Sequence, residues 1–268
     1  MKLIRSRENA RFKELRRLAT SSRERRSEGL ALLDGTHLIA AYRARGGVPE
    51  QLILSESGAA NAEAARLAAG IAAQAVLLLA DSLFGDIAQV ATPTGIVALI
   101  RTPQPGPVPE RIEQCVMLEN IQDAGNLGSI LRSTAAADIS TVLLSPGCAF
   151  PWSPKVLRAG MGAHFSLDIY DNVDLLAAAG KLSGRLVCTG SHAEKSVYEA
   201  DLRGPLAWAF GNEGAGLSAA LIAVAAEQVR IPMAGGTESL NVAAAAAICL
   251  FEQVRQKSCL PTASGLAA

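Results

Sequence analysis

Short apolar runs alternate along the chain with longer stretches in which apolar residues recur every three or four positions. Compact apolar runs predict buried strands, and the three-to-four spacing predicts helices that cover a sheet. In the first hundred residues the predicted strands are 30–33, 51–54, 75–79 and 95–100. The predicted helices there are 9–19, 36–45 and 61–69, and Asp81 is expected to cap a further short helix.

The same alternation returns in the second part of the chain. The predicted strands are 115–119, 141–144, 165–169, 185–189, 206–210 and 228–231, and helices fill the intervals, notably 126–137 and 240–255. Strands that alternate with helices indicate a mostly parallel sheet with helices on both faces. We therefore expect an α/β fold, with ligand-binding loops at the carboxyl ends of its strands.

Four prolines lie within residues 102–109, between the two alternating regions. Proline fixes φ and lacks a backbone N–H, so this stretch can be neither a helix nor a central strand. Such a composition predicts a semi-rigid linker. We expect two domains, 1–102 and 113–268, joined by a linker at 103–112.

Charge is distributed unevenly, although the net charge of the chain is zero. Residues 1–28 carry ten basic and four acidic side chains, so this segment has a charge of +6 and the remainder −6. A basic segment on an acidic body favours binding to a polyanion, and a solvated amphipathic helix is the alternative. The candidates for polyanion contact are Arg5, Arg7, Arg11, Arg25 and Arg26.

Half of the residues are hydrophobic, which allows a substantial core and argues against a disordered chain. The five cysteines are far apart without a CxxC pair, and the three histidines lie singly. This pattern fits reduced thiols in a cytoplasmic protein and predicts no metal site. The longest apolar run, 242–251, is too short to cross a bilayer, and no signal peptide is expected.

Three polar loops follow predicted strands and carry the candidate chemistry. In the first, 118–132, Asn126 can cap a helix whose second turn carries Arg132. In the second, 210–218, three glycines allow close backbone approach to a ligand, and Glu213 is the only charge. In the third, 231–243, Ser239 can cap the long helix, and Asn241 has no core-packing role. Each loop alone is also compatible with an ordinary turn.

Together and in this order, the loops resemble the motifs of the SpoU (TrmH-type) branch of the SPOUT methyltransferases. The second family motif matches 210–217, and the third matches 231–233 and 239–242. The N-terminal half is similar, more loosely, to the substrate-binding domain often fused to these enzymes. Ala124 and Asp34 depart from the usual Pro and Glu. The first motif, Asn-x-x-Asp-x-x-Asn-x-Gly-x-x-x-Arg, matches Asn120, Asp123, Asn126, Gly128 and Arg132.

The resemblance implies an α/β trefoil-knot domain at the C-terminus that dimerises through its long helices, and a smaller N-terminal α/β/α domain of ribosomal-protein type. The implied cofactor is S-adenosyl-L-methionine, and the implied reaction is methylation of a ribose 2′-hydroxyl in RNA. Ribosomal RNA is the preferred substrate, and transfer RNA stays open. The implied cofactor-binding residues are Gly211, Ile231, Met233 and Leu240, and the implied catalytic residues are Arg132, Asn126, Glu213, Asn241 and Ser239.

The three motifs contain no His, Cys or Lys, so the common general bases are absent from them. In similar enzymes the matching Arg is proposed to activate the hydroxyl, but arginine almost never gives up its proton. We expect Arg132 to hold a phosphate and to stabilise the developing alkoxide, with Glu213 as its ion-pair partner. Asn126 and Asn241 would position the ribose or the loops, and Ser239 would cap its helix.

Two other classes of function remain open from the sequence. One is a non-catalytic RNA-binding or assembly factor that keeps the fold. The other is a dinucleotide-dependent oxidoreductase, which is disfavoured because no GxGxxG follows the first strand of either half.

Overall fold

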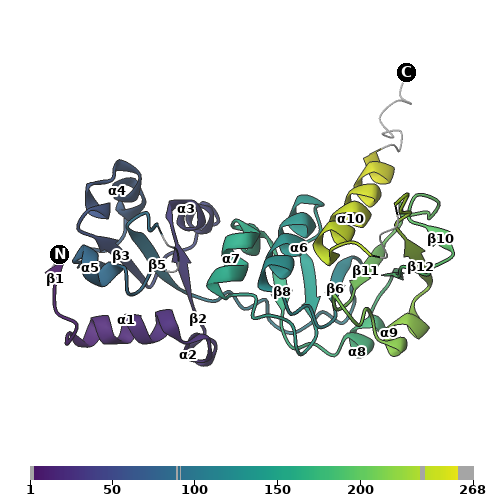
Figure 1. The fold of residues 1–268 in the computed structure, drawn as a ribbon, viewed down its shortest axis with the longest axis horizontal. Helices are drawn as coiled ribbons and strands as arrows, with labels where there is room; N and C mark the ends of the chain where they lie inside the picture. The colour runs from purple at the N-terminus through teal and green to yellow at the C-terminus, as the bar shows by residue number, and fades with distance from the viewer. Residues whose placement is uncertain (1–2, 89, 91, 236–238, 259–268) are drawn as a thin grey trace, which may run out of the picture. The chain divides into compact units, whose positions relative to one another are not determined.

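The computed structural model describes residues 3–88, 90, 92–235 and 239–258 (Figure 1). The chain divides into two compact units. Unit 1 comprises Met1–Pro103 and Trp152–Ser166, and unit 2 comprises Gln104–Pro151 and Leu167–Ala268. The proline-rich stretch contains neither helix nor strand. The assignment of Trp152–Ser166 to unit 1 has no counterpart in the sequence prediction, which placed this segment in the C-terminal domain.

Unit 1 is built on a five-stranded mixed sheet with the order β1-β4-β3-β5-β2. The strands β1, β4 and β3 are parallel, whereas β5 is antiparallel to both β3 and β2. The parallel strands therefore end at one common edge. The strand bounds are β1 Leu3–Ile4, β2 Leu30–Asp34, β3 Gln51–Ser55, β4 Val76–Leu79 and β5 Ile96–Arg101.

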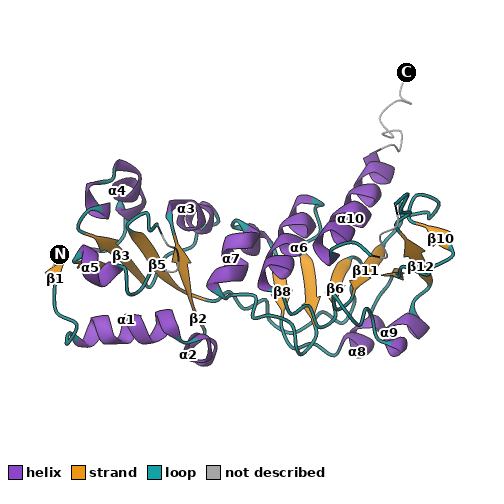
Figure 2. Ribbon diagram, viewed as in Figure 1, coloured by secondary structure: helices purple, strands orange, loops and turns teal. Residues whose placement is uncertain are grey.

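Helices cover both faces of this sheet, as Figure 2 shows. On one face, α1 buries Phe12, Leu15 and Leu18, which recur every three residues and pack into the core with strand residues such as Ile53. Asn9 caps α1 by accepting from the backbone of its first turn. The helices of unit 1 are α1 Ala10–Thr20, α2 Ser22–Glu28, α3 Thr36–Ala44, α4 Ala62–Ala68, α5 Asp81–Phe84 and α7 Pro154–Gly160.

Unit 2 contains a seven-stranded sheet with the order β10-β12-β9-β11-β6-β7-β8. All neighbouring strands described in this sheet are parallel, as the alternating pattern predicted. The strand bounds are β6 Cys115–Leu118, β7 Thr141–Leu144, β8 Asp168–Tyr170, β9 Arg185–Thr189, β10 Lys195–Ser196, β11 Leu206–Phe210 and β12 Glu227–Arg230.

The helices of unit 2 lie on both faces of its sheet, α6 and α10 on one and α8 and α9 on the other (Figure 1). Successive side chains of β11 pack alternately on the two faces of the sheet. Trp208 donates its ring N–H to Gln253 of α10 at 2.9 Å, whereas Ala207 and Ala209 pack with Leu175 and Leu221. The helix bounds are α6 Ala124–Ala136, α8 Leu175–Ala179, α9 Ala219–Val224 and α10 Val242–Ser258.

The structure corrects several local expectations. The predicted strand at 165–169 is wrong at its start, because residues 165 and 166 belong to a 3-10 helix, Ala163–Ser166, and β8 begins only at Asp168. The short elements α2, β1 and β10 were not predicted, whereas α7, α8 and α9 lie in intervals where helices were expected without stated bounds. Asp81 does not cap its own helix by a side-chain bond. Its carboxylate instead accepts from Ser57.

Candidate functional site

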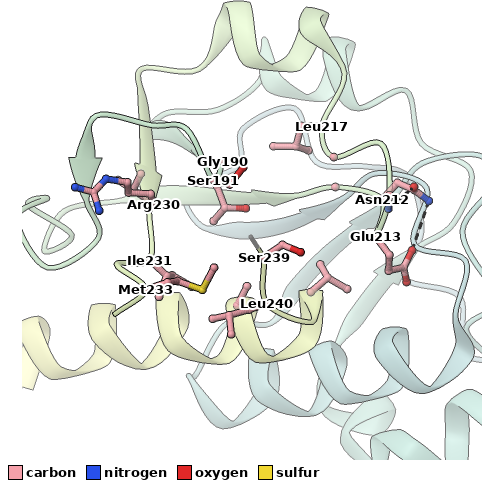
Figure 3. A pocket seen from close by; sticks show the side chains of 17 residues that line it. Gly190, Ser191, Asn212, Glu213, Leu217, Arg230, Ile231, Met233, Ser239 and Leu240 are labelled. Carbon is pink, nitrogen blue, oxygen red and sulfur yellow. Dashed lines mark hydrogen bonds between the residues drawn. The ribbon is translucent and has the colours of Figure 1, made fainter. Parts of the chain in front are cut away.

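The loops that follow β6, β9, β11 and β12 lie at one edge of the unit 2 sheet, because these strands are parallel. A pocket of 260 Å³ lies among three of these loops and the start of α10 (Figure 3). Its volume is close to the lower end of the range for small-molecule sites, roughly 300–1,000 Å³. Lining residues include Gly190, Gly211, Leu217, Ile231, Met233 and Leu240.

The glycine-rich loop after β11 folds back on itself to form one wall. Asn212 and Gly216 exchange two backbone hydrogen bonds, at 3.1 and 2.9 Å. A Cβ atom on Gly211 would lie 2.3 Å from the backbone of Gly216, so only glycine allows this closure. The side chain of Asn212 accepts from the backbone N–H groups of Gly214 and Ala215, at 3.0 and 2.9 Å. The loop therefore has a defined shape.

Three side chains from three separate segments form a hydrogen-bonded chain beside this wall: Asn126 in the first turn of α6, Glu213 in the glycine-rich loop and Asn241 directly before α10. The amide of Asn126 donates to the Glu213 carboxylate at 2.9 Å. The amide of Asn241 in turn donates to the carbonyl oxygen of Asn126 at 2.8 Å. Glu213 also accepts from the backbone N–H of Asp123 at 3.4 Å. The structure thus brings together three predicted catalytic residues that are 87 and 115 positions apart in sequence.

Hydrogen bonding keeps the Glu213 carboxylate ionised. Burial acts to raise the pKa of Glu213, but hydrogen bonds from Asn126 and from backbone N–H groups favour the charged form and outweigh it. The net result is a pKa below the ordinary value of 4.5. The site therefore holds a fixed negative charge near neutral pH.

The helix caps differ from those expected. Asp123, not Asn126, caps α6, since its carboxylate accepts from the Asn126 backbone at 2.8 Å. Asn241, not Ser239, accepts from the first turn of α10, at the N–H groups of Ala243 and Ala244. Ser239 lines the pocket instead. The residues between Met233 and Ser239 include 236–238, which lie outside the described part of the chain.

All four predicted cofactor-binding residues, Gly211, Ile231, Met233 and Leu240, line the pocket. In Figure 3, Met233 and Leu240 lie on one side of it and Leu217 on the other. Two described lining residues are charged, Glu213 and Arg230, and the Arg230 guanidinium extends away from the other labelled side chains. Apolar walls with exposed backbone groups fit an adenine nucleoside, and the Glu213 carboxylate suits a cationic sulfonium.

Arg132 does not join the chain of hydrogen bonds described above. It lies six residues after Asn126 on α6, about 9 Å further along the axis and on a different face. Its side chain is exposed and forms no ion pair or hydrogen bond with the described residues. The expected pair between Arg132 and Glu213 is therefore not formed within one chain.

Two residues that shape the glycine-rich loop, Asn212 and Glu119, were not predicted from the sequence. The amide of Asn212 donates to the Asn120 carbonyl oxygen at 2.9 Å, which ties the β11 loop to the β6 loop. The Glu119 carboxylate accepts from the Ser218 backbone at 2.6 Å and holds the far end of the loop. Glu119 directly follows a buried strand, and this position was a signal that could have identified it.

In unit 1, the predicted polyanion-binding arginines have different environments. Arg5, Arg7 and Arg11 are exposed and form ion pairs with Glu56, Asp86 and Glu14. Arg26 is exposed on α2. Arg25 requires a correction, because it is only 5% exposed. Its guanidinium donates to the Leu18 and Ala19 carbonyl oxygens at the end of α1, which is a structural role.

Membrane-spanning helices and clusters of metal-ligating side chains are both absent from the described residues. Within that part of the chain, no helix is both long and apolar enough to cross a membrane. No group of three or more His, Cys, Asp or Glu side chains there could hold a metal ion.

Comparison with known proteins places this geometry in a family. Residues 113–251 match the SpoU rRNA Methylase family, and residues 9–98 match the MRM3-like substrate binding domain. The chain is 30% identical to the 23S rRNA (guanosine(2553)-2′-O)-methyltransferase RlmP of Bacillus subtilis, over 94% of this chain and 98% of that protein.

Two solved structures have the same fold over nearly the whole chain. A structure of an RNA 2′-O ribose methyltransferase has a TM-score of 0.81 and 34% identity, covering 96% of this chain and 100% of that one. The AdoMet-bound rRNA methyltransferase from Sinorhizobium meliloti has a TM-score of 0.81 and 27% identity, covering 97% and 99%. The family match includes all three loops of the site, and this chain belongs to the SpoU rRNA methylase family.

Proposed function

We propose that this chain transfers the methyl group of S-adenosyl-L-methionine to a ribose 2′-hydroxyl of ribosomal RNA. The observation that carries the proposal is the hydrogen-bonded chain of Asn126, Glu213 and Asn241 beside the glycine-walled pocket. Similar proteins support it, since the names of the Bacillus subtilis relative and of the first solved structure specify 2′-O methylation.

Bound S-adenosyl-L-methionine would supply an activated methyl group on a sulfonium. This chain would contribute a pocket with backbone groups at its glycine loop and apolar contacts from Ile231, Met233 and Leu240. Such a pocket would hold the reacting atoms in line when the cofactor is bound, which can account for a large share of a methyl-transfer rate. Glu213 would face the cationic end of the cofactor.

Asn126 and Asn241 act as positioning residues in this proposal. The Asn126 amide donates to Glu213 and accepts from Asn241, while the Asn241 oxygen caps α10. Their polar atoms are therefore largely committed to holding Glu213 and the start of α10. No His, Lys or Cys is among the described lining residues, so the 2′-hydroxyl proton would leave through phosphate or water.

Arg132 would reach the site through a homodimer. It is exposed on α6, on a face other than that of Asn126, and α6 packs beside α10. Phe251 of α10 is 47% exposed and gives this helix an apolar surface for a second copy. We assign Arg132 to phosphate binding and alkoxide stabilisation at the partner's site. Sedimentation equilibrium tests the dimer, and a monomer at micromolar concentration would contradict it.

A trefoil knot in unit 2 is part of the same proposal. After β12, the chain returns as α10, which packs against α6 and covers Trp208 of β11. The returning segment thus crosses back over the sheet, as a knotted arrangement requires. Tracing residues 236–238 in a crystal structure would determine the crossing.

A cytoplasmic location is also proposed, because the thiols are isolated from one another. The four described cysteines are free. Burial raises the pKa of Cys115, Cys188 and Cys249 to about 12, so these thiols stay protonated and unreactive. Such buried, unpaired thiols are typical of a reducing compartment.

The decisive experiment is methyl transfer from radiolabelled S-adenosyl-L-methionine to ribosomal RNA and, in parallel, to transfer RNA, followed by mapping of 2′-O-methyl positions. We expect incorporation into ribosomal RNA at a ribose. Arg132→Ala should lower single-turnover methylation on the order of 100-fold or more without weakening cofactor binding. Arg111→Ala, at another exposed arginine of unit 2, is the matched control. Equal loss in both variants would remove Arg132 from its assigned role.

A further inference from the structure

A second cavity lies in unit 1, and none of its lining residues belongs to the glycine-walled pocket. Its volume is 310 Å³, and its lining includes Ser57, Asn61, Asp81, Phe84 and Thr94. It forms where the parallel strands β3 and β4 end, which is the edge at which α/β sheets bind ligands. The match to a substrate-binding domain covers this region but assigns no role to the cavity.

The polar groups of the cavity are held in fixed positions. Ser57 donates its backbone N–H and its hydroxyl to the Asp81 carboxylate, at 3.1 and 2.9 Å. Both bonds use Oδ1, which leaves Oδ2 for a further donor. These bonds hold the pKa of Asp81 below its ordinary value, so the group is ionised. Asn61 uses its carbonyl oxygen to cap α4, which leaves its amide N–H₂ as a donor.

The cavity also has a rigid apolar component. Phe84 is 2% exposed and lines the cavity together with Pro93. The two loops that form the wall touch at their backbones, because a Cβ atom on Gly58 would lie 2.2 Å from the Gly95 carbonyl oxygen. A flat, partly apolar ligand with polar groups along one edge fits such a space.

Two arginines stand next to this cavity, since β1 is parallel to β4 and ends at the same edge. Arg5 follows β1 and pairs with Glu56, the neighbour of Ser57, at 3.1 Å. Arg7 pairs with Asp86, the neighbour of the lining residue Gly85, at 3.0 Å. Both arginine side chains are mostly exposed, at 73% and 62%, so each can exchange its carboxylate for a phosphate.

We propose that this cavity binds one unstacked guanine base of the substrate RNA, with its flanking phosphates on Arg5 and Arg7. The edge of guanine carries N–H donors for the free oxygen of Asp81 and a carbonyl oxygen for the amide of Asn61. The face of the base lies against Pro93, which is exposed, while Phe84 belongs to the buried core behind the lining. The inference rests on the proposed function in that it takes RNA as the substrate.

Fluorescence anisotropy on the full chain tests the proposal with a labelled five-nucleotide RNA of uridines around one central guanosine. Matched probes carry uridine, adenosine, cytidine or inosine at the centre. We expect the guanosine probe to bind about tenfold more tightly than the uridine probe. Inosine, which lacks the exocyclic amino group, should lose most of that preference. Equal binding of all probes, or a preference for adenosine or cytidine, would overturn the proposal.

Two variants locate the preference. Asp81→Asn keeps an oxygen for Ser57 but places a donor where guanine needs an acceptor, and Asn61→Asp keeps the α4 cap but removes the donor. Each should abolish the guanosine preference, while Glu63→Gln, which matches the charge change of Asp81→Asn at an exposed neighbour, should retain it. A preference that survives in Asp81→Asn and Asn61→Asp would place guanine elsewhere.

The outcome can be separated from that of the proposed function. Methylation of ribosomal RNA by the unmodified chain is measured independently of the probes. Methylation without a guanosine preference would overturn the cavity proposal alone. A preference that depends on Asp81, without methylation of any RNA, would overturn the proposed reaction alone.

Discussion

The two units use their polar residues in opposite ways. In unit 2, the amides of Asn126 and Asn241 and the carboxylate of Glu213 are hydrogen-bonded to one another, although they come from three distant segments of the chain. In unit 1, the basic side chains are mostly exposed and pair with nearby acids, as Arg11 does with Glu14. The three residues of unit 2 form a fixed constellation, in which each partner has one position. The basic residues of unit 1 form a surface of exchangeable ion pairs.

Because of this difference, the spacing of motifs predicts the site of unit 2 more closely than a count of charges predicts the RNA contacts of unit 1. Amides have directional donors and acceptors, so residues that satisfy one another must occupy one geometry. Exposed ion pairs contribute about 0–1 kcal/mol each, so they can open for a phosphate at little cost. A count of charges therefore indicates a polyanion but does not identify which arginines contact it.

The strongest test of the fixed constellation is Asn126→Ala. Removing this amide leaves Glu213 and Asn241 without their shared partner, so the carboxylate loses its position. Because misplacement of a reacting group by about 1 Å can cost on the order of 100-fold, we expect kcat to fall by about that factor. Isothermal titration calorimetry should show a smaller loss of cofactor affinity than of kcat.

Two further variants show whether geometry is responsible. Asn126→Asp has the same shape but cannot donate to Glu213, so it should be as impaired as the alanine variant. Gln122→Ala removes an exposed amide of the same loop and should be nearly normal. If Asn126→Ala instead weakened cofactor binding and left kcat intact, Asn126 would belong to the cofactor site.

Substitutions among the exposed arginines of unit 1 should have smaller effects than Asn126→Ala, and the effects of separate substitutions should add. Arg16 and Arg23 are exposed, and their side chains form no ion pair with the described residues. Each change to Gln should lower RNA affinity about threefold and reduce the slope of log K against log salt by about 1. Filter binding at several salt concentrations measures both quantities.

Arg25→Gln is the matched contrast, because Arg25 holds the end of α1 through backbone carbonyl oxygens. Its loss should reduce the free energy of unfolding by about 1–3 kcal/mol and leave the salt slope unchanged. Chemical denaturation of the two kinds of variant would separate their roles. If folded Arg25→Gln protein showed a lower slope of log K against log salt, Arg25 would contact RNA and its purely structural role would be wrong.

Much of the fold followed from periodicity alone. Strands such as β7, β9 and β11 begin and end at the expected residues, because a buried parallel strand is a continuous apolar run between polar loops. The bounds of most short elements were not predicted. Helix α7, for example, has seven residues and is preceded by Ser153, whose cap bond only the folded chain reveals. Its packing with β2 is a long-range contact that no local pattern encodes.

The candidate site, like the fold, could be predicted only in part from the sequence. The motifs led to Asn126, Glu213 and Asn241, and the structure joined them. The identity of each partner depended on tertiary contacts. Asp123 is closer to the helix start and replaced Asn126 as the cap, while Glu213 accepted from amides in place of Arg132. Spacing along a chain predicts which residues lie at an edge, but hydrogen-bond partners depend on how loops from different strands meet.

The smallest expected effect is on the pH dependence of thermal stability, which isolates the contribution of Glu213. Its pKa is lowered in the folded chain, so the stabilisation it provides is fully present above 4.5, the ordinary value, and is lost as pH falls through the lower folded-state pKa. Glu213→Gln cannot titrate. We expect the unmodified chain to have the higher midpoint of thermal unfolding at neutral pH, and the gap to shrink on acidification below 4.5.

Thermal unfolding of both proteins across this range measures the gap directly. Because Glu213 is exposed, solvent weakens its interactions, and the gap should be modest at any pH. A gap that stayed constant below 4.5 would mean that the carboxylate gains nothing from its amide partners. The chain of Asn126, Glu213 and Asn241 would then be no more fixed than the ion pairs of unit 1, and the contrast between the units would fail.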